Sequence, residues 1–525
     1  MPISTQDHST QVAYQASGLL SLVNRFPTTL LVFLLIALNF LTFIPHTNEE
    51  QYLLYARQNF DPNWITGSLM ASEFPGTRLF YEYLTGWALH LFGFESTVFF
   101  GRAINYFLLA LPLAAFFKYL RFTNVQLLIC FQIFLLSKQS FFGNEWIFGA
   151  FEAKTLAYIF IFTALTRFVK GEYRSAFLWM IPATYFHILI GGWFAICCFL
   201  WLLFKRHAFS SIVQLGLLYG LPLLPLLYYL GKSMFAQLPA ELDTVNLNHV
   251  YVYVRNKHHI GLFYTFEYFL QRHLFGVSMA VISLFVLLRW KPLVAFLKDR
   301  PALHCLRSLH FIMLGIGFFY LGISLIDKVF FDLSGGFMLK AYPFRMQGLA
   351  LLFFVTIMMA FLFEHYGPRK WKPAFWTFLV AMLCLSALVQ SGENIQKMAQ
   401  YQSHEAYEEV IRFLKEQTPK SSVVLVLDNN KVSGYNQGHR NELAIDLIRR
   451  TERDNFFHFK YIPSTPTRMY AWYERLQLTR QLEDCPACIK ELKGDHKIDY
   501  MLTTRPVESF SKPVFQNVDF LVYKL

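Results

Sequence analysis

Long apolar stretches separated by short polar segments fill the first 400 positions of the chain. A stretch of this kind crosses a hydrocarbon layer of about 30 Å when it forms a helix of about 20 residues. The pattern predicts eleven membrane-spanning helices, over 28–45, 99–117, 124–137, 155–169, 174–188, 191–204, 211–230, 273–288, 308–326, 346–363 and 373–390. The shorter ones need tilt or an extension into their flanks.

The polar segments on the two sides of this predicted bundle differ in charge. With residues 1–27 in the cytoplasm, the segments on that side hold sixteen lysines and arginines, against eleven in the longer segments opposite. Because cytoplasmic loops carry the excess of positive charge, we expect a cytoplasmic N-terminus. The apolar run after Arg25 is too long for a signal peptide and lacks a small-residue cleavage site, so we expect it to stay as the first span.

This orientation places every long connection on the extracytoplasmic side. These connections are the loops 46–98, 138–154, 231–272 and 328–345. The cytoplasmic connections are mostly short turns, so we expect any chemistry or binding on the outer face of a bacterial cytoplasmic membrane.

The pattern changes after the helical domain 28–400. Helical periodicity over 403–419, 440–450 and 465–482 alternates with strand-like runs over 421–427, 499–504 and 518–525. Such alternation predicts a small α/β domain over 401–525, outside the membrane. The predicted fold class is therefore mainly α: a polytopic transmembrane bundle with a C-terminal extracytoplasmic α/β domain.

Composition agrees with a membrane protein. The chain of 525 residues is 55% hydrophobic and 16% charged, whereas soluble proteins carry about 25% charged residues. The net charge of +12 does not indicate a nucleic-acid partner, because the basic residues follow the predicted cytoplasmic loops. We expect membrane lipids as partners.

The seven cysteines do not form a disulfide framework. Five of them lie in or beside apolar runs, where cysteine behaves as a small hydrophobic residue. Cys485 and Cys488, in "EDCPACIK", follow a predicted helix rather than a strand, unlike the redox CxxC motif of thioredoxin-like folds. We expect a disulfide that closes a loop.

Two adjacent acids, Glu49 and Glu50, directly follow the first predicted span in "HTNEEQYLLYARQ". An acid at the membrane surface is partly desolvated, which raises its pKa and makes it a better general base. Position alone is equally consistent with an ordinary pair of acids beside the membrane.

The next outer loop carries "FFGNEWIFGAFEAKTLAY", with Glu145, Glu152 and Lys154 around an aromatic, glycine-containing turn. These residues either border a functional cavity or pair with one another. His187, at the end of the fifth predicted span, is either a catalytic group or a hydrogen-bond donor in helix packing.

Basic residues gather in two further outer segments, against the usual charge bias. They are Arg255, Lys257, His258 and His259 in "RNKHH", and Lys340 and Arg345 in "LKAYPFR". An anionic partner such as a lipid phosphate explains such residues, and arginine can hold phosphate through two parallel hydrogen bonds. The two histidines could instead bind a metal, although adjacent positions on a helix point in different directions.

These motifs resemble those of a known superfamily. The many spans, the acids in the first two outer loops and the outer α/β domain resemble the GT-C glycosyltransferases, which use polyprenyl-phosphate sugars. More narrowly, "FEAKTLAY", "FHILIGGW" and "RNKHH" resemble signatures of a family of bacterial GT-C-like multipass membrane proteins. That family has proline where this chain has Ile188 and Lys257.

The resemblance implies roles for the candidate residues. Glu49 or Glu50 would be the general base, and Glu145 or Glu152, with Lys154 and His187, would position the acceptor or provide a second acid. The basic residues would hold the lipid phosphate as leaving group, and the adjacent acids leave open whether a divalent metal takes part. The alternatives are a non-catalytic lipid or polysaccharide transporter, an assembly protein, or a scaffold whose tail recruits partners.

Overall fold

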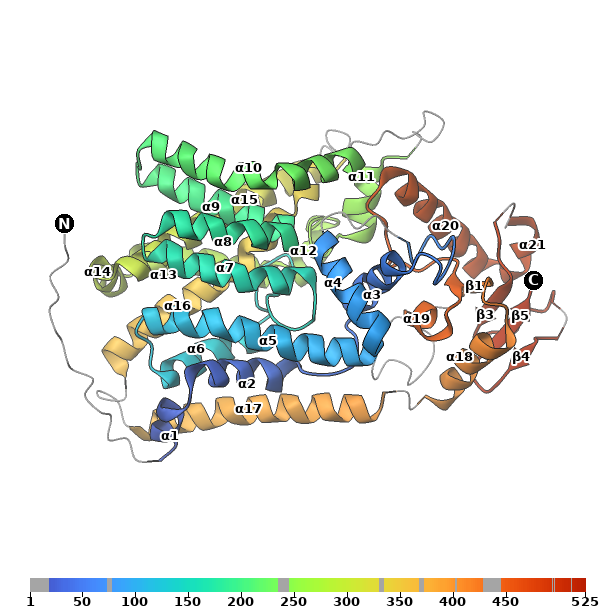
Figure 1. The fold of residues 1–525 in the computed structure, drawn as a ribbon, viewed down its shortest axis with the longest axis horizontal. Helices are drawn as coiled ribbons and strands as arrows, with labels where there is room; N and C mark the ends of the chain where they lie inside the picture. Colours follow the sequence, from blue (N-terminus) through green and yellow to red (C-terminus); the bar gives the residue numbers. More distant parts are fainter. Residues whose placement is uncertain are drawn as a thin grey trace.

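The computed structural model describes residues 18–72, 78–234, 245–329, 335–367, 373–401, 404–427, 445–492, 494, 496–510 and 512–525. Most of the helices lie roughly side by side in a bundle, and a small domain containing a β-sheet is attached to one end (Figure 1). We call this end of the bundle the junction end. The prediction of a mainly helical chain with a small C-terminal sheet is confirmed.

The bundle and its connections contain the following elements: α1 (Leu19–Arg25), α2 (Thr28–Phe40), α3 (Thr47–Phe60), α4 (Leu79–Phe92), α5 (Phe94–Tyr119), α6 (Asn124–Leu136), α7 (Ala153–Val169), α8 (Tyr173–Phe186), α9 (Ile188–Phe204), α10 (Phe209–Met234), α11 (Leu247–His249), η3 (Val250–Arg255), α12 (Phe266–Arg272), α13 (Leu274–Arg289), α14 (Lys291–Lys298), α15 (Pro301–Val329), η4 (Phe337–Ala341), η5 (Pro343–Met346), α16 (Gln347–Tyr366) and α17 (Pro373–Ala399). Each of the eleven predicted segments coincides with one of these helices.

Length and composition identify fewer spans than the sequence pattern does. Among the described residues, five helices are long and apolar enough to cross a membrane. The number rises to seven if two bent pairs, α1 with α2 and α12 with α13, each count as one span. Helices α6 and α9 are apolar but contain only 13 and 17 residues. The long apolar helices indicate a membrane protein, and the number of eleven spans stays a prediction.

The first long loop is more structured than its sequence pattern indicated. It contains α3 and α4, which pack closely because Gly86 has no side chain. A Cβ at that position would lie 2.5 Å from the Ala56 carbonyl oxygen. The hairpin of α3 and α4 lies between the bundle and the C-terminal domain (Figure 1).

The C-terminal domain contains α18 (Glu405–Gln417), β1 (Val423–Val426), α19 (Leu447–Thr451), β2 (Asp454–Asn455), α20 (Pro466–Asp484), η7 (Pro486–Cys488), α21 (Ile489–Leu492), β3 (Tyr500–Thr503), β4 (Phe515–Gln516) and β5 (Leu521–Lys524). The strand order is β2-β1-β3-β5-β4. Strand β1 pairs in parallel with β2 and β3, whereas β5 is antiparallel to β3 and β4.

The two faces of this sheet have different neighbours because strand residues alternate in direction. Val424 and Leu502 belong to a hydrophobic cluster with Val410 of α18. Leu425 and Met501 belong to a second cluster with Trp472 of α20. The same cluster contains Leu54, Trp64 and Met70 of the first long loop and Val250 of η3. The C-terminal domain is therefore packed onto the first long loop through a shared apolar core, which speaks against a free recruiting tail.

Candidate functional site

Helix α3 begins with a capping box in which Glu49 takes part. The His46 ring accepts a hydrogen bond from the Asn48 N–H at 3.2 Å, and Glu49 accepts one from the His46 N–H at 2.5 Å. Arg102 of α5 donates to Glu49 Oε1 at 2.9 Å, and the Phe151 N–H donates to the same oxygen. Glu49 is fully buried. Its carboxylate thus links α3, α5 and the segment before α7.

Glu50 points toward the C-terminal domain instead. Arg449 of α19 grips its carboxylate with two hydrogen bonds of 2.9 Å each. The same guanidinium donates to Glu95 at 2.5 Å and to the Tyr401 hydroxyl at 2.8 Å. Burial raises the pKa of Glu50 to about 7, and Arg449 lowers it only in part. Glu50 is therefore one half of a buried ion pair between the two domains.

Glu145 forms a second ion-paired group near the start of α16. Arg345 of η5 donates a hydrogen bond to Glu145 Oε2, and His259 Nδ1 lies 3.6 Å from Glu145 Oε1. His259 also lies 2.9 Å from the Gly143 carbonyl oxygen. Burial holds the pKa of His259 well below its usual range, so this ring is neutral at neutral pH. The loop between α6 and α7 thus meets the loop before α16.

Glu152 caps the first turn of α7, where its backbone N–H donates to Thr155 Oγ1 at 3.1 Å. Lys154 Nζ lies 3.7 Å from Glu152 Oε2 and 3.4 Å from the centre of the Trp146 ring. Glu152 and Lys154 are both buried. Among the described residues, Glu152 Oε1 has no hydrogen-bond partner. Burial raises the pKa of this carboxyl, although Lys154 acts against the shift.

These acids and bases belong to one group, which also includes His187, Arg78 and Tyr52. Arg345, Lys154 and Arg78 lie close enough to His187 for their charges to act on it. Arg78 also stacks on Tyr52, with 4.5 Å between the guanidinium carbon and the ring centre. We call this group the buried charge cluster. It consists of Tyr52, Arg78, Glu145, Glu152, Lys154, His187, His259 and Arg345.

Two more polar atoms of this cluster lack partners among the described residues. They are His187 Nδ1 and Arg345 Nε, and both are inaccessible to solvent. Buried polar atoms are nearly always hydrogen-bonded in folded proteins. Three such atoms in one cluster, counting Glu152 Oε1, indicate a place where a bound molecule would supply the missing hydrogen bonds.

The remaining basic residues do not form a single anion cradle. Arg255 donates to the Lys460 carbonyl oxygen at 3.1 Å and stacks on Phe459 at 5.4 Å. Lys257 lies 4.4 Å from the centre of the Tyr264 ring. Each cation therefore has a local partner, although the buried Arg255 Nε has none among the described residues.

Lys340 and His258 likewise lie among local partners. Lys340 donates to Asn248 at 3.0 Å. The ring of His258 lies 4.1 Å from that of His259, and burial lowers the pKa of His258. Of the basic residues selected from the sequence, only His259 and Arg345 belong to the buried charge cluster. The proposed phosphate-binding role of the others stays a prediction.

A cavity of about 720 Å³ lies beside the cluster. It is enclosed by the α2–α3 connection, the 137–150 loop, the last turns of α17 and Ile445 of the C-terminal domain. Its wall includes Glu50, Arg102 and Trp146. Because Trp146 also covers Lys154, this indole lies where the cavity meets the buried charge cluster. The size is that of a small-molecule site.

No metal centre is evident in the described part of the chain. No group of three or more His, Cys, Asp or Glu side chains is arranged there to hold a metal ion.

Cys485 and Cys488 are joined by a disulfide with 5.5 Å between their Cα atoms, in the C-terminal domain.

Sequence reasoning did not identify Arg102 or Arg449. Arg102 lies within a predicted span, and a lone cation in such a segment is a functional or structural signal in itself. Arg449 gave no local signal, because its partner Glu50 lies 399 positions earlier.

The chain matches no protein-family model and no curated protein.

Proposed function

We propose that the chain is a GT-C-like glycosyltransferase that moves a sugar from a polyprenyl-phosphate-linked donor to an acceptor hydroxyl, with Glu152 as the general base. The observation that carries this proposal is the buried Glu152 oxygen, which lacks a hydrogen-bond partner among the described residues. An acceptor hydroxyl is the type of group that would donate to it.

The hydrogen bonds of the three acids favour Glu152 over the two glutamates of α3. Glu49 is occupied by Arg102 and by two backbone N–H groups, and Glu50 is occupied by Arg449. Both carboxylate oxygens of Glu49 and of Glu50 accept hydrogen bonds. Glu152 is also paired, with Lys154 at 3.7 Å from Oε2, but its Oε1 has no partner among the described residues. Burial also raises the pKa of Glu152, which favours proton uptake by this carboxylate.

Arg345 is suited to the leaving group. Its side chain is 12% exposed, and its inaccessible Nε hydrogen is not used by any described residue. In the proposed step the acceptor oxygen attacks the anomeric carbon and its proton moves to Glu152. The bond between that carbon and the phosphate oxygen breaks, and polyprenyl phosphate leaves with the electron pair. A guanidinium stabilises this developing charge.

The membrane arrangement is part of the proposal. Eleven spans, a cytoplasmic N-terminus and an extracytoplasmic C-terminal domain put the buried charge cluster at the outer surface of a bacterial cytoplasmic membrane. The distribution of lysine and arginine supports this orientation. The Cys485–Cys488 disulfide supports it too, because disulfides persist mainly in oxidising compartments.

The proposal is tested with the purified chain reconstituted in vesicles. A panel of polyprenyl-phosphate-linked sugars is added together with candidate acceptor glycans, and mass spectrometry follows the release of polyprenyl phosphate. We expect release with at least one donor, and loss of release in Arg345→Gln. Vesicles that move donor lipid between leaflets without releasing polyprenyl phosphate would instead support the transporter alternative.

A further inference from the structure

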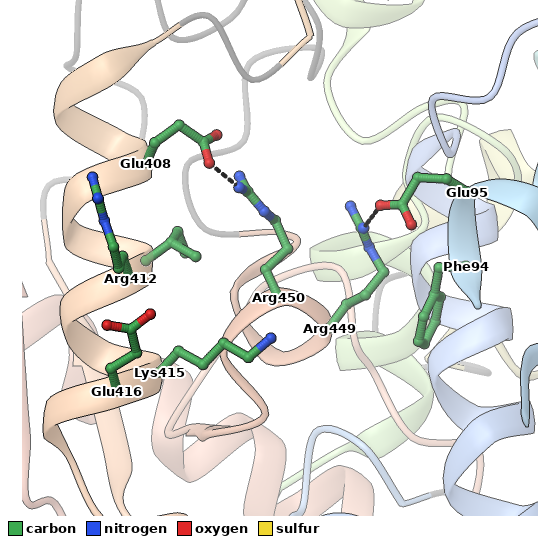
Figure 2. Close-up of a pocket in the computed structure, with 9 residues that line it drawn as sticks. Phe94, Glu95, Glu408, Arg412, Lys415, Glu416, Arg449 and Arg450 are labelled. Carbon is green, nitrogen blue, oxygen red and sulfur yellow. Dashed lines mark hydrogen bonds and ion pairs between the residues drawn. The ribbon is translucent and has the colours of Figure 1, made fainter.

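A second cleft lies at the junction end, separate from the buried charge cluster. It is a cleft of about 560 Å³ between the first residues of α5 and the helices α18 and α19 of the C-terminal domain. Figure 2 shows its charged side chains. We call it the junction cleft.

Two arginines, Arg449 and Arg450, line the junction cleft and are held in place by acids. Arg449 is paired with Glu95 at 2.5 Å, and Arg450 is paired with Glu408. Arg450 also lies 3.5 Å from Asp446. These contacts hold both guanidinium groups in place and neutralise part of their charge.

Two further cations, Arg412 and Lys415, come from the exposed side of α18 and have no described ion pair. In Figure 2 the Lys415 side chain extends from α18 across the cleft toward Arg450. Four cations and three acids line the cleft, the third acid being Glu416. Arg449 and Arg450 are already paired with acids, so the positive charge that remains for a bound anion is that of Arg412 and Lys415.

The position of the junction cleft suggests which anion. Phe94 and Glu95 begin α5, a candidate membrane span, and α18 follows shortly after α17, another candidate span. The cleft therefore lies at the end of two apolar helices, where lipid headgroups would meet the protein. Phe94 and Ile411 add apolar surface beside the charges.

We propose that the junction cleft binds the phosphate group of an anionic membrane lipid. Lys415 and Arg412 contribute charge from α18, and Arg450 contributes hydrogen-bond donors from α19. The lipid would thereby link the C-terminal domain to the membrane surface. This proposal does not depend on sugar transfer.

Native mass spectrometry of the full chain in detergent tests the proposal, with phosphatidylglycerol and phosphatidylcholine of equal acyl length as competing ligands. We expect preferential binding of phosphatidylglycerol that weakens as salt increases. Each cation near an anionic headgroup contributes about 1 kcal/mol, which is about fivefold in affinity. The double variant Arg412→Gln with Lys415→Gln should therefore bind the anionic lipid about thirtyfold more weakly.

Lys420→Gln is the matched control, because Lys420 is an exposed lysine that pairs with Glu452 outside the cleft. Unchanged melting temperatures would show that all variants are folded, as expected for exposed positions. Equal lipid binding by the double variant and the wild-type chain would overturn the proposal. Competition by glycerol phosphate as strong as that by the lipid would overturn the membrane lipid as occupant and assign the site to a soluble phosphate.

Discussion

The Glu50–Arg449 pair joins the C-terminal domain to α3, and the substitution Arg449→Met tests how much this contact stabilises domain docking. Methionine keeps most of the volume of the side chain and removes its charge. Glu50 would then remain buried without its cation, beside the acids Glu95 and Asp446.

The magnitude follows from the contacts that are lost. Arg449 makes two hydrogen bonds to Glu50, one to Glu95 and one to Tyr401. Removing one partner of a buried ion pair typically costs about 3–5 kcal/mol. Since about 1.4 kcal/mol changes an equilibrium constant tenfold, undocking should become about two to four orders of magnitude more favourable.

Hydrogen exchange followed by mass spectrometry measures this change in the intact chain. We expect faster exchange at the interface, in peptides covering α3 and α19, while peptides of α16 in the bundle exchange as in the wild type. Arg480→Met is the control, because Arg480 is exposed on α20 and has no described ion pair. The double variant Glu50→Gln with Arg449→Met should recover part of the protection, since no buried charge remains unpaired.

Two results would refute this reasoning. If Arg449→Met left exchange at the interface unchanged, the pair would not stabilise docking. If the double variant exchanged faster than Arg449→Met, an unpaired Glu50 charge would not be the cause of the lost protection at the interface.

Two other predictions follow from packing and from titration. Gly276→Ala should lower the free energy of unfolding by about 1–3 kcal/mol or more, because a Cβ there would lie 1.6 Å from the Phe141 carbonyl oxygen. Gly216 has open space around the same position, so the control Gly216→Ala should melt like the wild type. Equal melting temperatures for the two variants would contradict the packing argument. Burial raises the pKa of Glu50 to about 7 and that of Asp454 to about 6, so the folded chain binds more protons than the unfolded chain between about pH 4 and pH 7. The free energy of unfolding should therefore fall as the pH rises through this window and level off above about pH 7. Glu50→Gln should show a weaker dependence on pH. A melting temperature that rises with pH over the window would contradict this prediction.

The helical part of the fold was predictable because apolar runs of this length have few alternatives to a helix. The helix α4 was not predicted, because polar and apolar residues are mixed along its sequence. Trp87 and Leu91 of this helix are apolar and yet exposed. Strands β2 and β4 contain two residues each and have no pattern of their own. They exist because neighbouring strands supply their hydrogen-bond partners.

The candidate site was only partly predictable for a similar reason. Glu145, Glu152 and Lys154 lie within one short segment, so the sequence alone brings them near one another, and their functional role stays a prediction. The distribution of partners among the acids depends on contacts between distant segments, such as Glu49 with Arg102 and Glu50 with Arg449. Nothing in the local sequence distinguishes a carboxylate that is fully paired from one that has a free oxygen.

The central claim is that Glu152 takes the proton from the acceptor, and the most direct test compares transfer rates of Glu152→Gln and Glu152→Asp with the wild-type chain. Once a donor is identified, Glu152→Gln should lower the rate constant by about 100-fold or more, as expected for loss of a general base. Glu152→Asp should retain measurable transfer. Because Glu152→Gln leaves the buried Lys154 without its carboxylate, the rates are compared at a temperature below the melting temperature of every variant. Wild-type transfer by Glu152→Gln would contradict the account.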